Sequence, residues 1–237
     1  KGPIDFGDIA KDIDLALIAM GPGTPDLKIR RAIRELPISV PIGAIDASDS
    51  VDNHHEFYDY VAGRPTVYFK RELPVGATWA IPCPLSFPAS RAIKRTERDM
   101  KVFYHATDHG GGAPGIPRRQ IVGMLRDALP KYNLDVALYP GQAKGTRPSP
   151  EEYHERMSRC MIGISWNGAR NWDALRHWEN FAFGLCCVAE TPRIEIPNPF
   201  ENGTHCFYAD TPQEVAKMAI ELTQFPELAM SVAYAGH

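Results

Sequence analysis

Short apolar runs alternate with longer amphipathic segments along the chain, and this alternation predicts strands separated by helices. In the first part, strands are expected at 14–20, 40–46 and 66–72, and helices at 26–36 and 52–63. Prolines interrupt a short extended piece at 79–87. With three full strands at most, this part predicts an α/β lobe that is incomplete.

The alternation restarts beyond a charged linker at 90–100. Strands are expected at 101–107, 134–140, 161–166, 185–190 and 205–209, and helices at 115–129, 149–160, 172–184 and 211–225. Ser149 before Pro150 is typical of a helix N-terminus, and Asn171 is the expected N-cap of the next helix. The sequence thus predicts an α/β fold with two Rossmann-like lobes, residues 1–95 and residues 96–237. Because the last helical pattern is still running at the final residues, "AYAGH", we expect a piece of a longer protein.

Composition limits the classes of function. The chain has 237 residues, of which 44% are apolar and 23% charged, as is usual for a globular protein. A net charge of −3 provides no overall attraction to nucleic acid or to anionic membranes. No apolar run approaches the roughly 18 residues of a membrane-spanning helix. The five cysteines are odd in number and lack a C-x-x-C pair, which predicts buried thiols and a cytoplasmic location.

A glycine-rich segment, "GGGAPG" (110–115), lies between a predicted strand and a predicted helix and matches G-x-G-x-x-G. Its amides and the helix N-terminus suit a phosphate, although the same glycines suit a plain surface loop equally well. The candidate phosphate contacts are Gly110, Gly111 and Gly112. A dinucleotide site would also need an acid at the end of the next strand, which ends in Tyr139 instead. A nicotinamide cofactor is therefore not expected.

Three charged residues are candidates for ligand contact. Arg118 lies in the first turn of a predicted helix, where a cation opposes the helix dipole and an anion would compensate it, or it is a solvated surface arginine. Arg176 and Glu179 are one turn apart on another helix. They form either an exposed ion pair or part of a site where parallel strands end. A guanidinium suits a diphosphate and a carboxylate suits ribose hydroxyls, which favours the site.

The segment "RHWENFAFG" and the 35 residues that follow it resemble the C-terminal half of glycosyltransferases with the GT-B fold. The similarity is to the spore-protein-type (glycosyl transferases group 1-like) and exostosin-like families. It covers residues 101–237, and only "IDASD", "YFKRE" and "IPCPLSF" extend it faintly into the first half. The residues that carry the resemblance are Arg176, Glu179, Gly184, Phe200, Gly203, His205, Tyr208 and Asp210.

The resemblance implies a nucleotide-sugar donor, UDP- or GDP-linked, that is bound by the second lobe. It implies that Glu179 binds the ribose, that Arg176 faces the diphosphate, and that Tyr139, Pro140 and Gly141 flank the base. Trp166 and Asn167, at the end of a predicted strand, complete the donor-side candidates. The retaining members of the family carry a second glutamate where this chain has Asn171, so the stereochemical outcome stays open.

An inverting transfer needs a base that reaches the acceptor hydroxyl. Asp46 and Asp49 follow the strand at 40–46 in the expected acceptor-side lobe and are the first candidates. His54, His55, His105 and Asp108 are further candidates. No Asp-x-Asp follows an apolar strand, so metal-independent donor binding is expected.

These features predict a glycosyltransferase that moves a sugar across an interdomain cleft to an acceptor whose identity the sequence does not indicate. Two alternatives stay open. A sugar-nucleotide epimerase would use the same donor pocket without an acceptor, and a non-catalytic two-lobed module would only bind the nucleotide or sugar. No basic stripe indicates a nucleic-acid partner.

Overall fold

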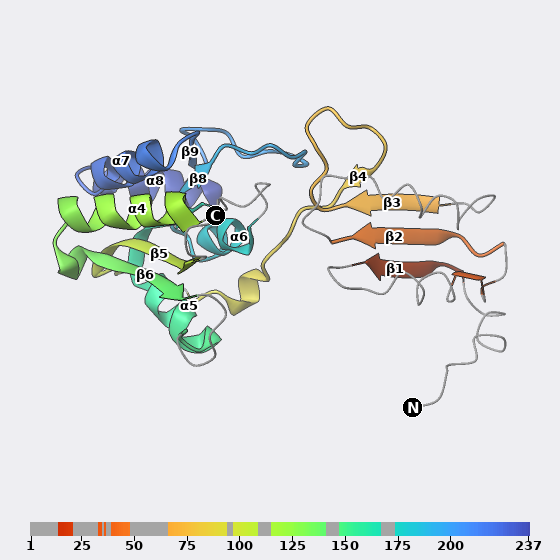
Figure 1. Cartoon of the computed structure of the whole chain (residues 1–237), viewed down its shortest axis with the longest axis horizontal. Helices are drawn as coiled ribbons and strands as arrows, with labels where there is room; N and C mark the ends of the chain where they lie inside the picture. The colour runs from red at the N-terminus through yellow and green to blue at the C-terminus, as the bar shows by residue number, and fades with distance from the viewer. Residues whose placement is uncertain are drawn as a thin grey trace. The chain divides into compact units, whose positions relative to one another are not determined.

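The structure is a computed structural model that describes residues 14–20, 33–34, 36, 39–47, 66–93, 97–108, 115–140, 147–166 and 174–237. The chain forms two compact units. Each unit has its own sheet, and strands of both sheets are labelled in Figure 1. The first unit comprises Lys1–Pro84 and Arg193–Pro197, and the second comprises Leu85–Pro192 and Asn198–His237. Both units contain a parallel sheet, which confirms the predicted α/β class.

The first unit contains a four-stranded parallel sheet in the order β1-β2-β3-β4. The strands are β1 (Ala16–Met20), β2 (Ile42–Asp46), β3 (Thr66–Lys70) and β4 (Ile81–Pro82). The first three confirm the predicted strands, and β4 lies in the piece that prolines interrupt. Ile42 and Ala44 of β2 form a small core with Ile33 and Tyr68. Most of the two helices expected here lies outside the described residues.

Residues 193–197 belong to the first unit although they follow the second unit's fourth strand in the sequence. Ile194 pairs with Pro74 in an antiparallel bridge, and the amide of Glu195 donates to the carbonyl of Leu73 at 2.7 Å. The Glu195 carboxylate also accepts from the amide of Gly76 at 2.6 Å. The chain therefore returns to the first unit once before it completes the second, which a linear division at residue 95 does not predict.

The second unit contains a five-stranded parallel sheet in the order β6-β5-β7-β8-β9. The strands are β5 (Met100–Asp108), β6 (Leu134–Pro140), β7 (Cys160–Ser165), β8 (Cys186–Glu190) and β9 (Phe207–Ala209). The helices are α4 (Gly115–Ala128), α5 (Pro150–Ser158), α6 (Leu175–Ala182), α7 (Pro212–Leu222) and α8 (Pro226–Gly236). All five predicted strands are confirmed.

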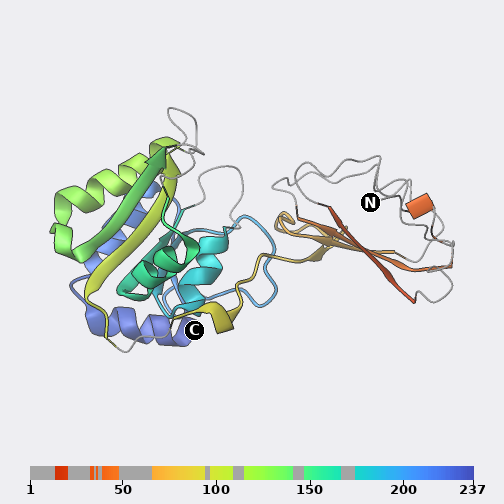
Figure 2. The ribbon, with the colours of Figure 1, turned by 90° about the horizontal axis from the view of Figure 1, so that it is seen from below.

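Helices cover both faces of this sheet (Figure 2). Val102, Tyr104 and Ala106 of β5 pack in one cluster with α4, α7 and α8, whereas Phe103 packs in another cluster with Met157 of α5. The period of two follows from the strand geometry, in which successive side chains point to opposite faces. Because both faces are buried, the strands are almost continuously apolar.

The order of the strands determines which face each helix covers. From β5 the chain runs through α4 to β6, and it then returns through α5 past β5 to β7. Right-handed crossovers in opposite directions place their helices on opposite faces, so α4 and α5 lie on different sides of the sheet. The carboxyl ends of β5 and β7 are therefore a topological switch point, where such sheets bind ligands.

Helix α6 is shorter than the sequence predicts. It begins at Leu175 rather than at 172, and its N-cap is Ala174, which offers no side-chain hydrogen bond. The expected cap, Asn171, lies outside the described residues. At the other end, Gly184 has φ +64° and donates to Phe181, while Leu185 donates to the carbonyl of Asn180. This Schellman motif explains why glycine follows the helix.

Helix α5 confirms its predicted start, because the Ser149 hydroxyl accepts from the amide of Glu152 at 3.1 Å and Pro150 follows the cap. The predicted thiols are also confirmed, since all five cysteines are free and four of them are buried. In the described part of the chain, no helix combines the length and apolar character needed to cross a membrane.

Candidate functional site

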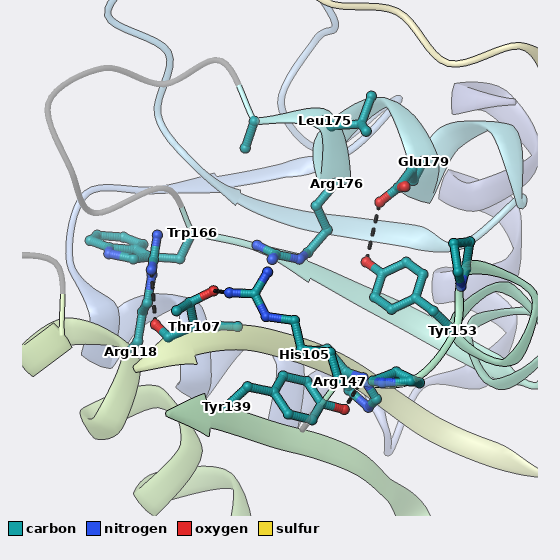
Figure 3. Close-up of a pocket in the computed structure, with 14 residues that line it drawn as sticks. His105, Thr107, Arg118, Tyr139, Arg147, Tyr153, Trp166, Leu175, Arg176 and Glu179 are labelled. Atoms are coloured by element: carbon teal, nitrogen blue, oxygen red, sulfur yellow. Dashed lines mark hydrogen bonds between the residues drawn. The ribbon is translucent and has the colours of Figure 1, made fainter. Parts of the chain in front are cut away.

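A pocket of about 390 Å³ lies at the carboxyl ends of β5, β6 and β7 (Figure 3). Its walls come from these strand ends, the first turns of α4 and α6, and α5 with the segment that precedes it. The side chains with polar groups in its lining are His105, Thr107, Arg118, Tyr139, Arg147, Tyr153, Trp166, Arg176 and Glu179. Its position is the topological switch point, and its volume suits a small-molecule ligand.

Three guanidinium groups converge on the pocket, from α4, from α6 and from the segment before α5. Arg118 of α4 is buried and donates to the carbonyl of Thr107 at 2.9 Å, and Arg147 donates to the Thr107 hydroxyl at 2.7 Å. Arg176 of α6 lies with its guanidinium carbon 5.7 Å from the centroid of the Tyr104 ring. Figure 3 shows Arg147 and Arg176 directed into the same central space. Thr107 thus holds two of the three cations in place.

The like charges of these arginines influence one another. Burial lowers the pKa of Arg118; Tyr104 partly offsets this effect, and the positive charge of Arg176 lowers the pKa further. The Nε atom of Arg176 is buried and has no hydrogen-bond partner among the described residues. A buried donor without a partner costs about 1–3 kcal/mol. An anion in the pocket would reduce the repulsion between Arg118 and Arg176, and it would accept a hydrogen bond from Nε of Arg176.

Glu179 is the only carboxylate in the described lining of the pocket. Within the described residues it forms no ion pair with Arg176, so the exposed pair that the spacing allows is absent. Its Oε2 atom accepts from the Tyr153 hydroxyl at 3.2 Å, and its Oε1 atom lies 3.6 Å from Nε2 of His154. Burial raises the pKa of Tyr153, which therefore remains a donor to Glu179 at physiological pH. The carboxylate is thus oriented by α5.

A chain of polar groups crosses the base of the pocket from β6 to β5. The Tyr139 hydroxyl and Nδ1 of His105 are 2.9 Å apart, and Nε2 of His105 is 2.6 Å from Oδ1 of Asp135. Arg156 of α5 contacts both oxygens of Asp135, at 2.8 and 2.5 Å. Burial alone would raise the pKa of Asp135, but hydrogen bonds from His105 and Arg156 outweigh it and lower the pKa to about 2.

The structure brings together five of the residues that the sequence nominates for donor binding. They are Arg118, Tyr139, Trp166, Arg176 and Glu179. Pro140 ends β6 and is exposed, outside the pocket lining. Gly110, Gly111, Gly112, Gly141 and Asn167 lie outside the described residues, as do the candidate bases Asp49, His54 and His55. Of the candidate bases that the structure describes, His105 lines the pocket, whereas Asp46 and Asp108 do not.

Asp46 ends β2 in the first unit and is fully buried. Its carboxylate lies 2.9 Å from Nζ of Lys70 and accepts from the Tyr68 hydroxyl at 2.9 Å. Lys70 is also fully buried, and it is the register partner of Asp46 on β3. A buried carboxylate with a buried cation is explained by internal charge pairing, and we propose no substrate contact for it.

The remaining residues of the family-like motif have structural contacts outside the pocket. The Phe200 ring stacks on Phe181 with centroids 3.8 Å apart. His205 accepts from the amide of Glu201 through Nδ1 at 3.0 Å. Asp210 precedes Thr211, the N-cap of α7, and its amide donates to the Glu214 carboxylate of the capping box at 3.1 Å. These three residues lie between β8 and α7, before and after β9, and none of them lines the pocket.

Sequence reasoning did not identify Arg147, Tyr153 or Asp135 as site residues. Arg147 lies two residues before Ser149, the N-cap of α5. A cation between a strand end and the next helix could have been recognised in the sequence as a candidate for ligand contact. Tyr153 is four residues beyond the same cap and faces the sheet from α5. Asp135 follows the start of an apolar strand, and a buried acid in such a strand requires a partner.

Among the described residues, no group of three or more His, Cys, Asp or Glu side chains is arranged to hold a metal ion. No protein-family model matches the sequence, and no curated protein matches it at a significant level. The identification of the pocket's ligand therefore depends on the chemistry of the pocket itself.

Proposed function

We propose that the pocket binds the diphosphate of a nucleotide sugar, UDP- or GDP-linked, and that the protein transfers the sugar to an acceptor hydroxyl. The observation that carries this proposal is the convergence of Arg118, Arg147 and Arg176 on one pocket whose described lining holds a single carboxylate. One guanidinium group can donate two parallel hydrogen bonds to phosphate oxygens, and these interactions are strong where water is partly excluded.

The position of the carboxylate supports a nucleotide rather than inorganic phosphate. Glu179 lies one helical turn beyond Arg176, so a group bound to both would present an anion and, next to it, a hydroxyl. The diphosphate and ribose of a nucleotide carry these two groups in that order. Tyr153 occupies one carboxylate oxygen of Glu179 and orients the other.

The same arginines provide a reason for catalysis. When the bond between the sugar and the diphosphate breaks, negative charge develops on the diphosphate oxygen. Fixed cations that already surround this position stabilise the transition state more than the ground state. We therefore propose that the leaving group is stabilised by Arg118, Arg147 and Arg176.

Calorimetry with UDP, GDP and ADP tests the proposal. We expect at least one nucleotide to bind the wild-type protein, and Arg176→Gln to weaken binding by about 10- to 100-fold, the usual range for a charged hydrogen bond. Arg119→Gln is the matched control. Arg119 follows Arg118 near the start of α4, but its side chain is exposed and pairs with Asp108 of β5 at 2.9 Å. This variant should change affinity less than twofold.

The proposal is wrong if no nucleoside diphosphate binds, or if the two variants weaken binding equally. Slow hydrolysis of the sugar from a bound UDP- or GDP-sugar then separates a transferase from a binding module. An epimerase would instead convert the donor to an isomeric nucleotide sugar.

A further inference from the structure

The Tyr139–His105–Asp135 chain has a defined direction. Asp135 is ionised at physiological pH, because its pKa is about 2, and a carboxylate only accepts hydrogen bonds. Nε2 of His105, 2.6 Å away, must therefore carry a proton. In the neutral imidazole this leaves Nδ1 without a proton. Nδ1 is then the acceptor for the Tyr139 hydroxyl at 2.9 Å.

This direction has a consequence for the pocket. Since the Tyr139 proton is donated to His105, the lone pairs of the phenolic oxygen are available to the pocket that Tyr139 lines. A ligand hydroxyl could donate to that oxygen. The Phe103 ring stacks on His105 with centroids 4.5 Å apart, and His105 is only 2% exposed, so the imidazole is held in one orientation.

We propose that His105, held by Asp135, is the proton acceptor of the transfer reaction, and that the Tyr139 hydroxyl relays the proton to it. This inference rests on the proposed function. It places the base in the second unit, beside the arginines, rather than at Asp46 or Asp49 in the first unit.

The step balances without a further reactant. The acceptor oxygen bonds to the anomeric carbon of the sugar, the bond from that carbon to the diphosphate oxygen breaks, and its electron pair leaves with the diphosphate. The acceptor proton passes to the Tyr139 oxygen as the Tyr139 proton passes to Nδ1 of His105. Tyr139 ends neutral, and the resulting imidazolium is paired with the Asp135 carboxylate. A single displacement of this kind inverts the anomeric configuration.

Several titratable groups face His105 or its two partners from the neighbouring elements. β6 contributes Asp135 and Tyr139, and α5 contributes Tyr153, whose ring centroid is 5.8 Å from the imidazole. Two charged groups of α5 extend this network: Arg156 binds Asp135, and Glu152 pairs with Arg156. Two more, Arg147 and Glu179, lie in the pocket lining.

The test combines NMR of the imidazole with kinetics on two conservative variants, Tyr139→Phe and His105→Gln. In the wild-type protein, ¹⁵N NMR of the neutral imidazole should show Nε2 protonated and Nδ1 unprotonated. Turnover of the UDP- or GDP-sugar that binds should rise over the pH range in which His105 loses its Nδ1 proton. Each variant should lower kcat by about 10²- to 10⁴-fold and leave the Kd for the nucleoside diphosphate within threefold. Tyr132→Phe is the matched control, because Tyr132 is 73% exposed and outside the pocket.

The proposed relay is wrong if NMR shows Nε2 unprotonated in the neutral imidazole, or both nitrogens still protonated at pH 9. Either result counts whether or not a nucleotide binds. Nucleotide binding without any turnover overturns it and leaves donor binding intact. If Tyr139→Phe changes Kd or KM but not kcat, the chain merely positions the pocket wall. A product with retained anomeric configuration also overturns the single displacement.

Discussion

The Asp135 network allows a quantitative prediction of stability. Asp135 is 7% exposed, and its carboxylate is held by His105 and by two nitrogens of Arg156, Nε and Nη2. Replacing Asp135 with Asn keeps the size of the side chain and removes its charge. The substitution leaves Arg156 and His105 with a neutral partner, so it isolates the electrostatic part of the network.

The magnitude follows from the pKa of Asp135, which is lowered from 3.8 to about 2. That difference corresponds to about 2 kcal/mol of folding free energy at neutral pH. Because the folded-state pKa is the lower one, this stability is fully present above the unfolded-state value. It is lost as the pH falls towards 2. We therefore expect Asp135→Asn to cost about 2 kcal/mol at pH 7 and about 1 kcal/mol at pH 3.

Urea unfolding followed by circular dichroism measures the decrease in unfolding free energy. Hydrogen exchange of the β5 and β6 amides assigns the unfolding transition to the second unit. Asp99→Asn is the matched control, because Asp99 also binds an arginine, Arg159, but is exposed. It should cost less than about 1 kcal/mol. Equal losses in the two variants, or a loss for Asp135→Asn that does not change with pH, would refute the reasoning.

Two further predictions concern α6 and the pocket. A Cβ added at Gly163 would lie 2.2 Å from Oδ1 of Asn180, so Gly163→Ala should destabilise the second unit by about 1–3 kcal/mol in thermal unfolding. Gly123→Ala, where a Cβ meets nothing within 4 Å, should be neutral or stabilising and is the control. Tyr153→Phe removes the donor to Glu179 and should weaken nucleotide binding about 3- to 10-fold by calorimetry, without lowering unfolding free energy by more than about 1.5 kcal/mol. Unchanged affinity in Tyr153→Phe would contradict the role assigned to Glu179.

Part of the candidate site could be predicted from local signals. Arg176 and Glu179 were nominated by their one-turn spacing after a strand, and Arg118 by its position at a helix start. Trp166 was nominated because it ends an apolar strand, and Tyr139 through the resemblance to glycosyltransferases. The general rule that ligands bind at the carboxyl ends of parallel strands was sufficient for Trp166, Arg176 and Glu179, because they lie at or after the end of one predicted strand.

The other part depends on contacts between elements far apart in the sequence. His105 and Asp135 are 30 residues apart, and Asp135 and Arg156 are 21 apart, yet they form one network. Nothing in the local pattern of β6 indicates that its acid faces a histidine of β5. That pairing depends on the strand register, which places Phe103 opposite Asp135 and His105 opposite Ala137. Asp46 illustrates the converse, because its sequence position suggests a base and its register partner Lys70 neutralises it.

By itself, the sequence determined the α/β class, the first three strands of one sheet, all five strands of the other and the cap of α5, because apolar periodicity and capping are properties of neighbouring residues. The tertiary structure decided the order of the strands, the return of residues 193–197 to the first unit, and which polar side chains meet. Those features depend on how separate elements pack, and the free energy of burying a charge or leaving a donor unpaired is defined only once the partners are in place.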